Sequence, residues 1–345
     1  MEINKSYNNL PWQTGEQIVQ NSLSFIIPTV GARENIFTII DQLKRGIKGS
    51  FEIIVVLQPS KGNREDIVKM FVGLPGIRLE TNKGKLSSGA NRNRGAEKAT
   101  GKFICFIDDD ITLEESFITF LNEGILDENT VYFPEIRNER HVPFPLGDHV
   151  GGRSYVSACF VVSKGAFLQT GHFNEELNIY REDSEFFIRA RMNGLELKFV
   201  EDVFVQHPVR FTNGKTIRSF FTKNTYEPLF HKITGGEYHG VMKSHFTSTL
   251  PGRQGFSIVT YFISLAVSIM VLLLIIGLAQ VIPFLMVSYL ILATVPTFVY
   301  IHKPEIFLDH GKLYKIPLIA IYLLIMPELF VARLIGSIRY GHFAI

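Results

Sequence analysis

Short apolar runs alternate with amphipathic segments along the first part of the chain. Apolar runs at residues 23–27, 51–57, 77–80 and 103–107 predict strands, and apolar residues at helical spacing predict helices between them, at about 36–46, 63–72 and 86–100. A further helix is expected from about residue 182, followed by strand residues at 197–200 and 203–207. Strands that alternate with helices in this way are typical of a doubly wound, mostly parallel α/β sheet. The pattern therefore predicts an α/β domain over residues 1–208.

The hydropathy of the chain changes beyond residue 253. Residues 256–276 carry no charge and are about long enough to cross the hydrocarbon core of a bilayer, and a second uncharged helix is expected at about 281–301. A third apolar stretch, about 316–335, contains Glu328 and Arg333, so it could span a membrane or lie in its interface. These stretches predict a membrane domain of two to three helices over residues 256–345. A buried helical bundle in a soluble protein is the less favoured alternative.

A basic segment, residues 209–255, joins these two parts. It contains seven lysines and arginines against two glutamates, with aromatic residues between them. Such a segment beside an apolar stretch is typical of an interfacial helix on an anionic leaflet, and a helix packed on the soluble domain is the alternative. The positive-inside rule then predicts a multi-pass protein of the cytoplasmic membrane with its α/β domain on the cytoplasmic side. The N-terminal residues lack the basic flank and apolar core of a signal peptide.

Composition and the absence of some motifs narrow the function classes. The net charge of +2 gives no electrostatic support for a nucleic-acid partner. The two cysteines, Cys105 and Cys159, lie within apolar runs and are expected to be buried thiols, not a disulfide or a metal pair. No glycine-rich dinucleotide or P-loop motif follows a strand, which disfavours a dinucleotide enzyme or a P-loop ATPase.

Three consecutive aspartates, Asp108, Asp109 and Asp110, directly follow the strand predicted at 103–107. Open α/β sheets bind their ligands at the carboxyl ends of the strands. Three adjacent like charges favour a bound cation, and a hard ion such as Mg²⁺ or Mn²⁺ that itself holds a phosphate fits this need. The alternative is an acidic loop that leads into a helix, since residues 112–115 resemble a capping box that starts at Thr112.

Polar residues in the segment 82–95 are candidates for ligand binding. Small residues there let the backbone approach a ligand, while Lys85, Asn91 and Arg92 can donate hydrogen bonds to phosphate or sugar oxygens. A small-residue helix packed tightly on the sheet is the equally weighted alternative.

Two further candidates lie in the second half of the α/β domain. Glu182 and Asp183 open a predicted helix, where the helix dipole stabilises acidic side chains, and where a carboxylate can also be tuned to act as a general base. His207 stands at the end of the last predicted strand and is either a structural histidine or a metal ligand.

Taken together, these segments resemble the family-2 glycosyltransferases of the GT-A fold over roughly residues 20–208. The resemblance is carried by an ordered set of motifs: the first-strand signature at residues 26–35, Ala-Asn-Arg-Asn-Arg-Gly at 90–95, the D-x-D at 108–110, the G-x-F-D-E-x-L element at 171–177 and the E-D pair at 182–183. Any one motif is weak, but their order and separation make the set specific. The resemblance implies a nucleotide-diphospho-sugar transferase fold.

The resemblance also implies a role for each matched residue. Asp183 matches the catalytic base, and the implied metal ligands for Mn²⁺ or Mg²⁺ are Asp110, Asp108 and His207. The residues implied in donor binding are Pro28, Thr29, Glu34, Gln58, Lys85, Asn91, Arg92, Asp108, Asp109 and Glu182.

Two departures from the family pattern limit what the resemblance implies. Residues 57–60 are Leu-Gln-Pro-Ser where relatives commonly have Asp-Asp-Gly-Ser, so a UDP-sugar donor is only the default. The chain has no Q-x-x-R-W element of the kind found in polymer synthases, which predicts a single or limited, non-processive transfer. The long, turn-rich segment at 134–152 is either an acceptor-binding lid or a surface excursion.

The sequence therefore predicts a membrane-anchored, inverting glycosyltransferase that uses a nucleotide sugar. Its expected acceptor is a lipid-linked saccharide or another envelope glycan, because the apolar stretches hold the site near membrane lipids. One alternative is transfer to polyprenyl phosphate, although such enzymes often show D-A-D at the metal site. The non-enzyme alternative is a membrane scaffold that kept the fold and lost turnover.

Overall fold

The computed structural model describes residues 22–30, 35–58, 64–71, 73–81, 87–123, 125–138, 147–148, 155–177, 180–208, 210–211, 214–235 and 331–343, with the single residues 269 and 283. The chain divides into two units. Unit 1 comprises residues 1–139, 150–178 and 182–208, and unit 2 comprises residues 140–149, 179–181 and 209–345.

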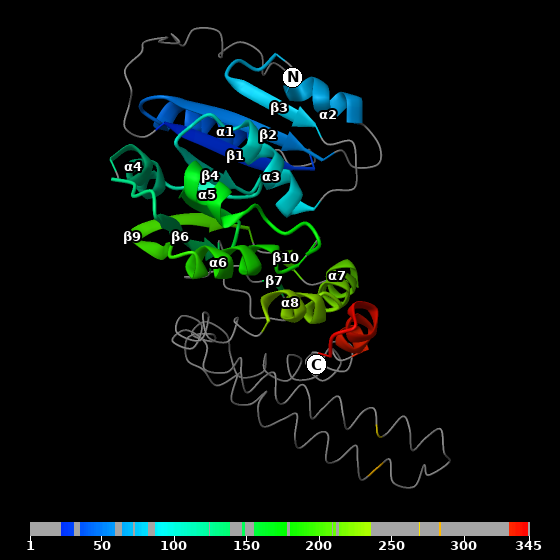
Figure 1. The fold of residues 1–345 in the computed structure, drawn as a ribbon. Helices are drawn as coiled ribbons and strands as arrows, with labels where there is room; N and C mark the ends of the chain where they lie inside the picture. The colour runs from blue at the N-terminus through cyan, green and yellow to red at the C-terminus, as the bar shows by residue number, and fades with distance from the viewer. Residues whose placement is uncertain are drawn as a thin grey trace. The chain divides into compact units, whose positions relative to one another are not determined.

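Unit 1 is an α/β domain whose eight-stranded sheet is flanked by helices (Figure 1). Its strands are β1 (Leu23–Thr29), β2 (Phe51–Leu57), β3 (Ile77–Thr81), β4 (Phe103–Ile107), β5 (Thr112–Leu113), β6 (Thr130–Asn138), β8 (Cys159–Ser163) and β9 (Glu196–His207). Its helices are α1 (Asn35–Gly46), α2 (Arg64–Phe71), α3 (Ser88–Lys98), α4 (Glu115–Glu123), α5 (Lys164–Thr170) and α6 (Glu182–Met192). The strand order is β3-β2-β1-β4-β8-β6-β9-β5.

The sheet is mixed, not mostly parallel as the sequence predicts. Strands β3, β2, β1 and β4 pair in parallel, joined by helical crossovers as expected. Beyond β4, strand β8 runs antiparallel to both β4 and β6, and β5 runs antiparallel to β9, while β6 and β9 are parallel. The two strands β6 and β8 were not among those predicted, and the antiparallel pairing of β8 with β4 and with β6 is what makes the second half of the sheet mixed.

The capping box proposed at Thr112 is wrong. Thr112 and Leu113 form the short strand β5, which pairs with Gln206 and Val205 of β9, and α4 begins only at Glu115. The hydrogen-bonding groups of Thr112 therefore contribute to a sheet instead of a helix start.

The core of unit 1 explains why its central strands are apolar throughout. Every residue of β1 and of β4 is buried. Alternate residues of β1 face opposite sides of the sheet: Phe25 and Ile27 join the cluster that also holds the buried face of α1, whereas Ile26 faces Gly95 of α3. Strands covered on both faces have no solvent side, so they lose the polar–apolar alternation of half-exposed strands. Cys105 and Cys159 are free and buried, as predicted.

Replacing Gly95 with alanine is expected to destabilise unit 1 by about 1–3 kcal/mol, the usual cost of overpacking. A Cβ at this position would overlap Cγ2 of Ile26 and lie 3.1 Å from Cγ2 of Val56, and both side chains are fixed in the sheet. Gly165→Ala in α5 is the matched control, since no atom lies within 4 Å of the added Cβ. Urea unfolding of both variants measures the difference, and equal midpoints would contradict the close approach of α3.

Part of the predicted lid at residues 134–152 is regular structure. Residues 134–138 are the last part of β6, and residues 135–138 pair with β9, so this part of the lid prediction is wrong. Residues 147–148 form β7, and the remainder of the segment lies outside the described residues.

The described part of unit 2 consists mainly of helices. It contains β7 (Gly147–Asp148) paired with β10 (Arg210–Phe211), then α7 (Gly214–Asn224), α8 (Glu227–Thr234) and a C-terminal helix over residues 331–340. Leu229 and Phe230 of α8 are buried. The apolar stretches at 256–276, 281–301 and 316–335 lie outside the described residues except at 269, 283 and 331–335. No helix within the described ranges has the length and apolar character needed to cross a membrane.

Candidate functional site

The three aspartates leave β4 in a tight turn that sends their side chains to different partners. The backbone N–H of Asp108 donates to the carbonyl of Ala158 (2.8 Å), and Ile111 N–H donates to the carbonyl of Asp108 (3.2 Å). Asp109 accepts a hydrogen bond from the hydroxyl of Thr29 at the end of β1 (2.7 Å). The carboxyl ends of β1 and β4 therefore meet at this turn, as the sequence predicts for a ligand-binding edge.

Asp108 forms an ion pair with the buried side chain of Arg92. The guanidinium donates to Oδ1 of Asp108 and, at 2.6 Å, to the hydroxyl of Ser88, and only 2% of the Arg92 side chain is exposed. Burial raises the pKa of Asp108 above its ordinary value, and the nearby charge of Asp110 adds to this although Arg92 opposes it. With its side chain buried, Arg92 acts on the site through Asp108.

Asp110 lies next to His207, and both are buried. The distance from Nε2 of His207 to Oδ2 of Asp110 is 3.7 Å. Nδ1 of His207 is buried without a hydrogen-bond partner in the described part of the chain, so this nitrogen is not committed to a structural hydrogen bond. A carboxylate suits Mn²⁺ or Mg²⁺, and a neutral imidazole is a common ligand of metal ions. Mg²⁺ often takes only one or two protein carboxylates and binds substrate phosphates and water with the rest. No cluster of three or more such side chains occurs among the residues that the structure describes.

The carboxylate of Asp183 is held in place by backbone donors at the start of α6. Ser157 N–H donates to Oδ2 of Asp183 (3.3 Å) and Ser184 N–H donates to Oδ1 (2.7 Å). The side chain is half-buried, so one face stays accessible. Sequence reasoning did not identify Ser157, because a backbone donor leaves no trace in residue type.

The carboxyl group of Glu182 interacts electrostatically with both Asp183 and Asp108. It is 9% exposed, and burial together with the charges of Asp183 and Asp108 raises its pKa to about 7, while Arg92 opposes the rise. A Cβ on Gly89 of α3 would lie 3.2 Å from Cγ of Glu182, so the starts of α3 and α6 are adjacent. The site therefore brings Asp108, Arg92, Glu182 and Asp183 together.

The raised pKa of Glu182 predicts a pH-dependent stability. Between pH 4.5 and about 7 the folded protein holds this proton more tightly than the unfolded chain does. The contribution of Glu182 is therefore full below pH 4.5 and is lost as the pH rises through 7, by about 3 kcal/mol. In Glu182→Gln, the unfolding free energy measured in urea without metal or donor should fall less steeply over this range. Identical pH dependence in the variant and in the wild type would contradict this assignment.

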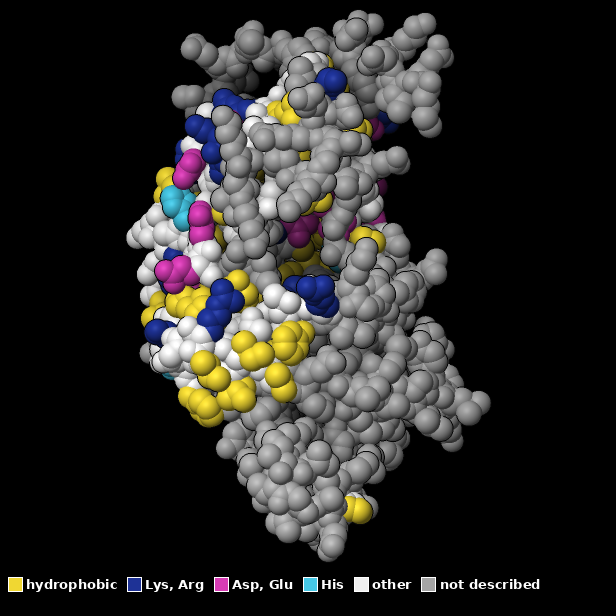
Figure 2. Space-filling view, turned by 90° about the vertical axis from the view of Figure 1, so that its right-hand side faces the viewer, with side chains coloured by type: hydrophobic (Ala, Val, Ile, Leu, Met, Phe, Trp, Pro, Cys, Tyr) yellow, Lys and Arg dark blue, Asp and Glu magenta, His cyan; other side chains and the backbone are white. Residues whose placement is uncertain are grey.

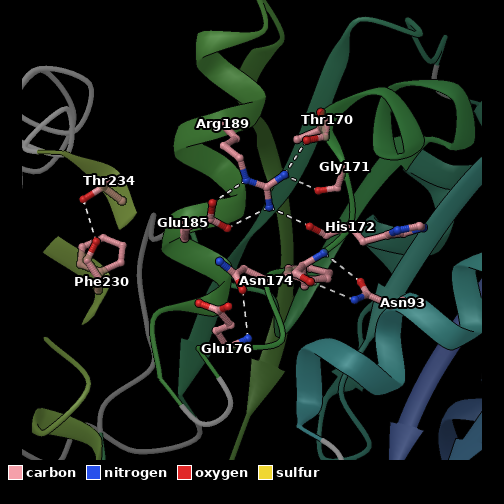
Figure 3. Close-up of polar contacts among 11 residues, drawn as sticks. Asn93, Thr170, Gly171, His172, Asn174, Glu176, Glu185, Arg189, Phe230 and Thr234 are labelled. Atoms are coloured by element: carbon pink, nitrogen blue, oxygen red, sulfur yellow. Dashed lines mark hydrogen bonds and ion pairs between the residues drawn. The ribbon is translucent and has the colours of Figure 1, made fainter. Parts of the chain in front are cut away.

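The loop from Thr170 to Leu177 is fixed on both sides (Figure 3). On one side the Arg189 guanidinium donates to the carbonyls of Thr170 (2.5 Å), Gly171 and His172 (2.7 Å) while Glu185 holds its other edge (Nε to Oε1, 2.5 Å). On the other side, Asn93 of α3 pairs with the Phe173 backbone: its Nδ2 donates to the carbonyl (2.9 Å), and its Oδ1 accepts from Phe173 N–H (2.8 Å). Neither Asn93 nor Arg189 was among the predicted site residues; the acid-base spacing of Glu185 and Arg189 was the available signal.

This loop packs against Arg92 and against the start of α3, both of which belong to the acidic site. The Phe173 ring lies 5.8 Å from the Arg92 guanidinium, and a Cβ on Gly89 would lie 3.0 Å from Cβ of Phe173. The G-x-F-D-E-x-L segment thus holds the arginine that pairs with Asp108.

The remaining predicted donor-binding residues lie partly outside the described structure. Asn91 donates to Oε1 of Gln58 (3.0 Å), and Gln58 N–H donates to the carbonyl of Thr29 (2.8 Å), which brings these three residues together. Pro28 is buried within β1. Glu34 and Lys85 lie outside the described residues.

Comparison with known proteins identifies the domain that carries this site. Residues 24–194 match the family described as Glycosyl transferase family 2. These residues form a glycosyltransferase family 2 domain. It includes Asp108–Asp110, Glu182 and Asp183; His207 lies beyond the matched range.

Two curated relatives match part of this chain. Amylovoran biosynthesis glycosyltransferase AmsB of Erwinia amylovora is 28% identical over 167 residues, which are 43% of this chain and 53% of that protein. Uncharacterized glycosyltransferase YibD of Escherichia coli strain K12 is 33% identical over 112 residues, which are 31% of this chain and 32% of that protein. The chain thus spans about half, or a third, of the length of these relatives.

A solved structure supports the predicted GT-A-type α/β fold. Mannosyltransferase PcManGT from Pyrobaculum calidifontis, in complex with GDP-Man and Mn²⁺, superposes with a TM-score of 0.51 over 95% of this chain and 91% of that chain. At 12% identity the likeness concerns the fold alone.

Proposed function

We propose that this protein is a glycosyltransferase that moves a sugar from a nucleotide-sugar donor to a hydroxyl group of a glycan acceptor. The observation that carries the proposal is the assembly of Asp108–Asp110 and Glu182–Asp183 in one site, joined through Arg92. A domain that only binds nucleotide sugars needs the first group but has no need of the second.

Asp110 and His207 would hold Mn²⁺ or Mg²⁺, and Asp108 would face the donor's ribose and phosphate. When bound, the metal would neutralise the negative charge that develops on the departing diphosphate. Thr29, Gln58 and Asn91 would line the nucleoside end, where the hydrogen-bonding amide of Gln58 stands in place of the usual carboxylate. UDP is the default nucleotide, and GDP is the one held by the mannosyltransferase of the same fold.

Asp183 would accept the proton of the acceptor hydroxyl. The two backbone donors orient its carboxylate, and its half-exposed position leaves room for an acceptor. Glu182, whose pKa is raised to about 7, is partly protonated at neutral pH, which reduces its repulsion of the base. With a single nucleophile, direct displacement inverts the anomeric carbon; a product that retains the donor's configuration would contradict this mechanism.

We further propose that the protein is anchored in the cytoplasmic membrane, with the domain of residues 1–208 on the cytoplasmic side. Support comes from the uncharged stretches at 256–276 and 281–301 and from the basic segment at 209–255. Hydrophobic side chains also gather beside lysine or arginine on one face of the described surface (Figure 2). Exposed apolar side chains of the C-terminal segment are Val331, Ile335, Ile338 and Phe343. Release of the full chain from membranes by alkaline carbonate would contradict anchoring.

The acceptor would then be a lipid-linked saccharide or another envelope glycan, with one or few sugars added per encounter. The deciding experiment incubates the purified full-length chain with a panel of nucleotide sugars, with and without Mn²⁺. Each donor is offered either a lipid-linked saccharide or free polyprenyl phosphate. Transfer to the saccharide supports the proposal, and transfer to polyprenyl phosphate alone replaces it with that reaction. Donor binding without any transfer would instead support a scaffold that has lost turnover.

A further inference from the structure

Arg181, the residue bonded to Glu182, has an unusual backbone conformation. Its φ is +70°, and among the described non-glycine residues only Asp202 shares a positive φ. L-residues avoid this region because Cβ crowds the backbone, so such a conformation persists only where surrounding contacts enforce it. The side chain of Arg181 makes contacts of this kind.

The Arg181 side chain is held by a buried glutamate of α8. Nε and Nη2 both donate to Oε1 of Glu227, at 3.0 and 2.7 Å, and the Glu227 side chain is only 4% exposed. The Arg181 guanidinium also lies over the rings of Tyr180 and Phe230, 4.8 and 5.6 Å from their centroids. Charge-assisted hydrogen bonds with low solvent access are among the strong ones, so this pair can hold a strained residue.

Glu227 is placed to keep its charge. Burial alone would raise the pKa of Glu227, but Arg181 and Arg333, with a smaller effect of His231, outweigh it and lower the pKa to about 2. Arg333 comes from the C-terminal helix, which packs against the start of α8 so closely that a Cβ on Gly336 would overlap the carbonyl of Thr225. Arg333, one of the charged residues of the third apolar stretch, thus has Glu227 as an acidic neighbour.

We propose that Glu227 is a positioning residue for the Glu182–Asp183 pair: by holding Arg181 it fixes the backbone directly before α6. The effect passes through the peptide bond from Arg181 to Glu182 and requires no contact of Glu227 with a substrate. The catalytic consequence rests on the proposed role of Asp183 as the base; the structural consequence does not.

Three variants of the full-length protein separate the ion pair from its surroundings. Glu227→Gln keeps the shape but removes the charge, and Arg181→Gly removes the side chain while accepting the positive φ. Lys232→Met is the matched control: it is exposed on the same helix, and its ammonium donates to the Tyr340 carbonyl of the C-terminal helix (2.9 Å). Arg181→Gly leaves Glu227 beside Arg333, so it tests the proposal even if Glu227→Gln folds poorly.

The first measurement is hydrogen–deuterium exchange at residues 184–188, in the first turns of α6. Glu227→Gln and Arg181→Gly should each speed exchange there about tenfold or more, as expected for loss of charge-assisted hydrogen bonds that oppose local opening. Lys232→Met should not. Unchanged exchange in both pair variants, or an equal increase in Lys232→Met, would overturn the proposal.

The second measurement is steady-state kinetics with the nucleotide sugar that the donor panel identifies as the substrate. A displaced Asp183 should lower kcat about tenfold or more in both pair variants, with the donor dissociation constant unchanged. The double variant should be no worse than either single one, because both break the same pair. If the wild-type protein transfers no sugar but the pair variants still exchange faster than wild type, the structural positioning is supported and the proposed function is not. Normal kcat in both pair variants of an active enzyme would overturn the positioning of Asp183.

Discussion

Asp183→Asn is expected to lower kcat by about 10²–10⁴-fold, the range that a positioned general base contributes. The asparagine amide has nearly the same shape as the carboxylate and still accepts a hydrogen bond from Ser157 N–H or Ser184 N–H through its oxygen. It cannot take up the proton of an attacking hydroxyl. Since Asp183 is not among the expected ligands of the nucleotide, the donor dissociation constant should change little. Stopped-assay kinetics and calorimetric donor binding on the same preparation measure the two effects.

Glu176→Gln is the matched control for this experiment. Glu176 is an exposed acid of the loop that precedes α6. The substitution removes one carboxylate and leaves the pair at residues 182–183 unchanged. Its kcat should stay at the wild-type value. If Asp183→Asn retained wild-type turnover, another group would have to be the base and the proposed mechanism would be wrong. If donor binding were lost together with turnover, Asp183 would serve in binding instead.

The sequence predicted the parallel half of the sheet because each element there has a local signal. Strands β2 and β4 have the predicted bounds, since residues buried on both faces form short, continuous apolar runs. The four buried residues of α1, Ile36, Ile39, Ile40 and Leu43, are the apolar residues whose helical spacing predicts this helix. The second half of the sheet was predicted less completely, because β6 and β8 join it through antiparallel pairing that depends on partners distant in the sequence. The short β5 shows the same limit: its pairing with β9 outweighs the local preference of Thr112 for a helix start.

The sequence likewise predicted only part of the candidate site. Residue types and spacing were enough to nominate Asp108–Asp110 and Glu182–Asp183, which the structure brings together. They could not distinguish an arginine that meets a ligand from one that is buried, and Arg92 is the buried kind. The supports of the site are pairs far apart in sequence, such as Asn93 with Phe173 and Arg181 with Glu227. Their side chains have no periodic pattern, so only the folded chain reveals them.

Asp110→Ala should weaken Mn²⁺-dependent donor binding by at least about 10–100-fold, since even groups that only support metal ligands have effects of that size. In the described part of the chain, Asp110 faces His207 at 3.7 Å, and the alanine variant keeps the imidazole but removes the hard, charged oxygen ligand that Mn²⁺ prefers. His207→Ala should weaken binding in the same direction but less, because it removes a neutral ligand. Glu97→Gln, which removes an exposed acid from α3, is the matched control and should bind normally.

Binding is measured by calorimetry with the donor in the presence of Mn²⁺ or of a chelator, and by the electron paramagnetic resonance signal of Mn²⁺ in the ternary mixture. The second readout does not depend on turnover, so a variant that is inactive for another reason cannot imitate the expected result. If wild type and Asp110→Ala bound the donor equally well in chelator and in Mn²⁺, donor binding would need neither a metal nor Asp110, and the metal assignment would be wrong. In that case the repulsion among Asp108, Asp109 and Asp110 would have to be offset within the protein, by Arg92 and the Thr29 hydroxyl.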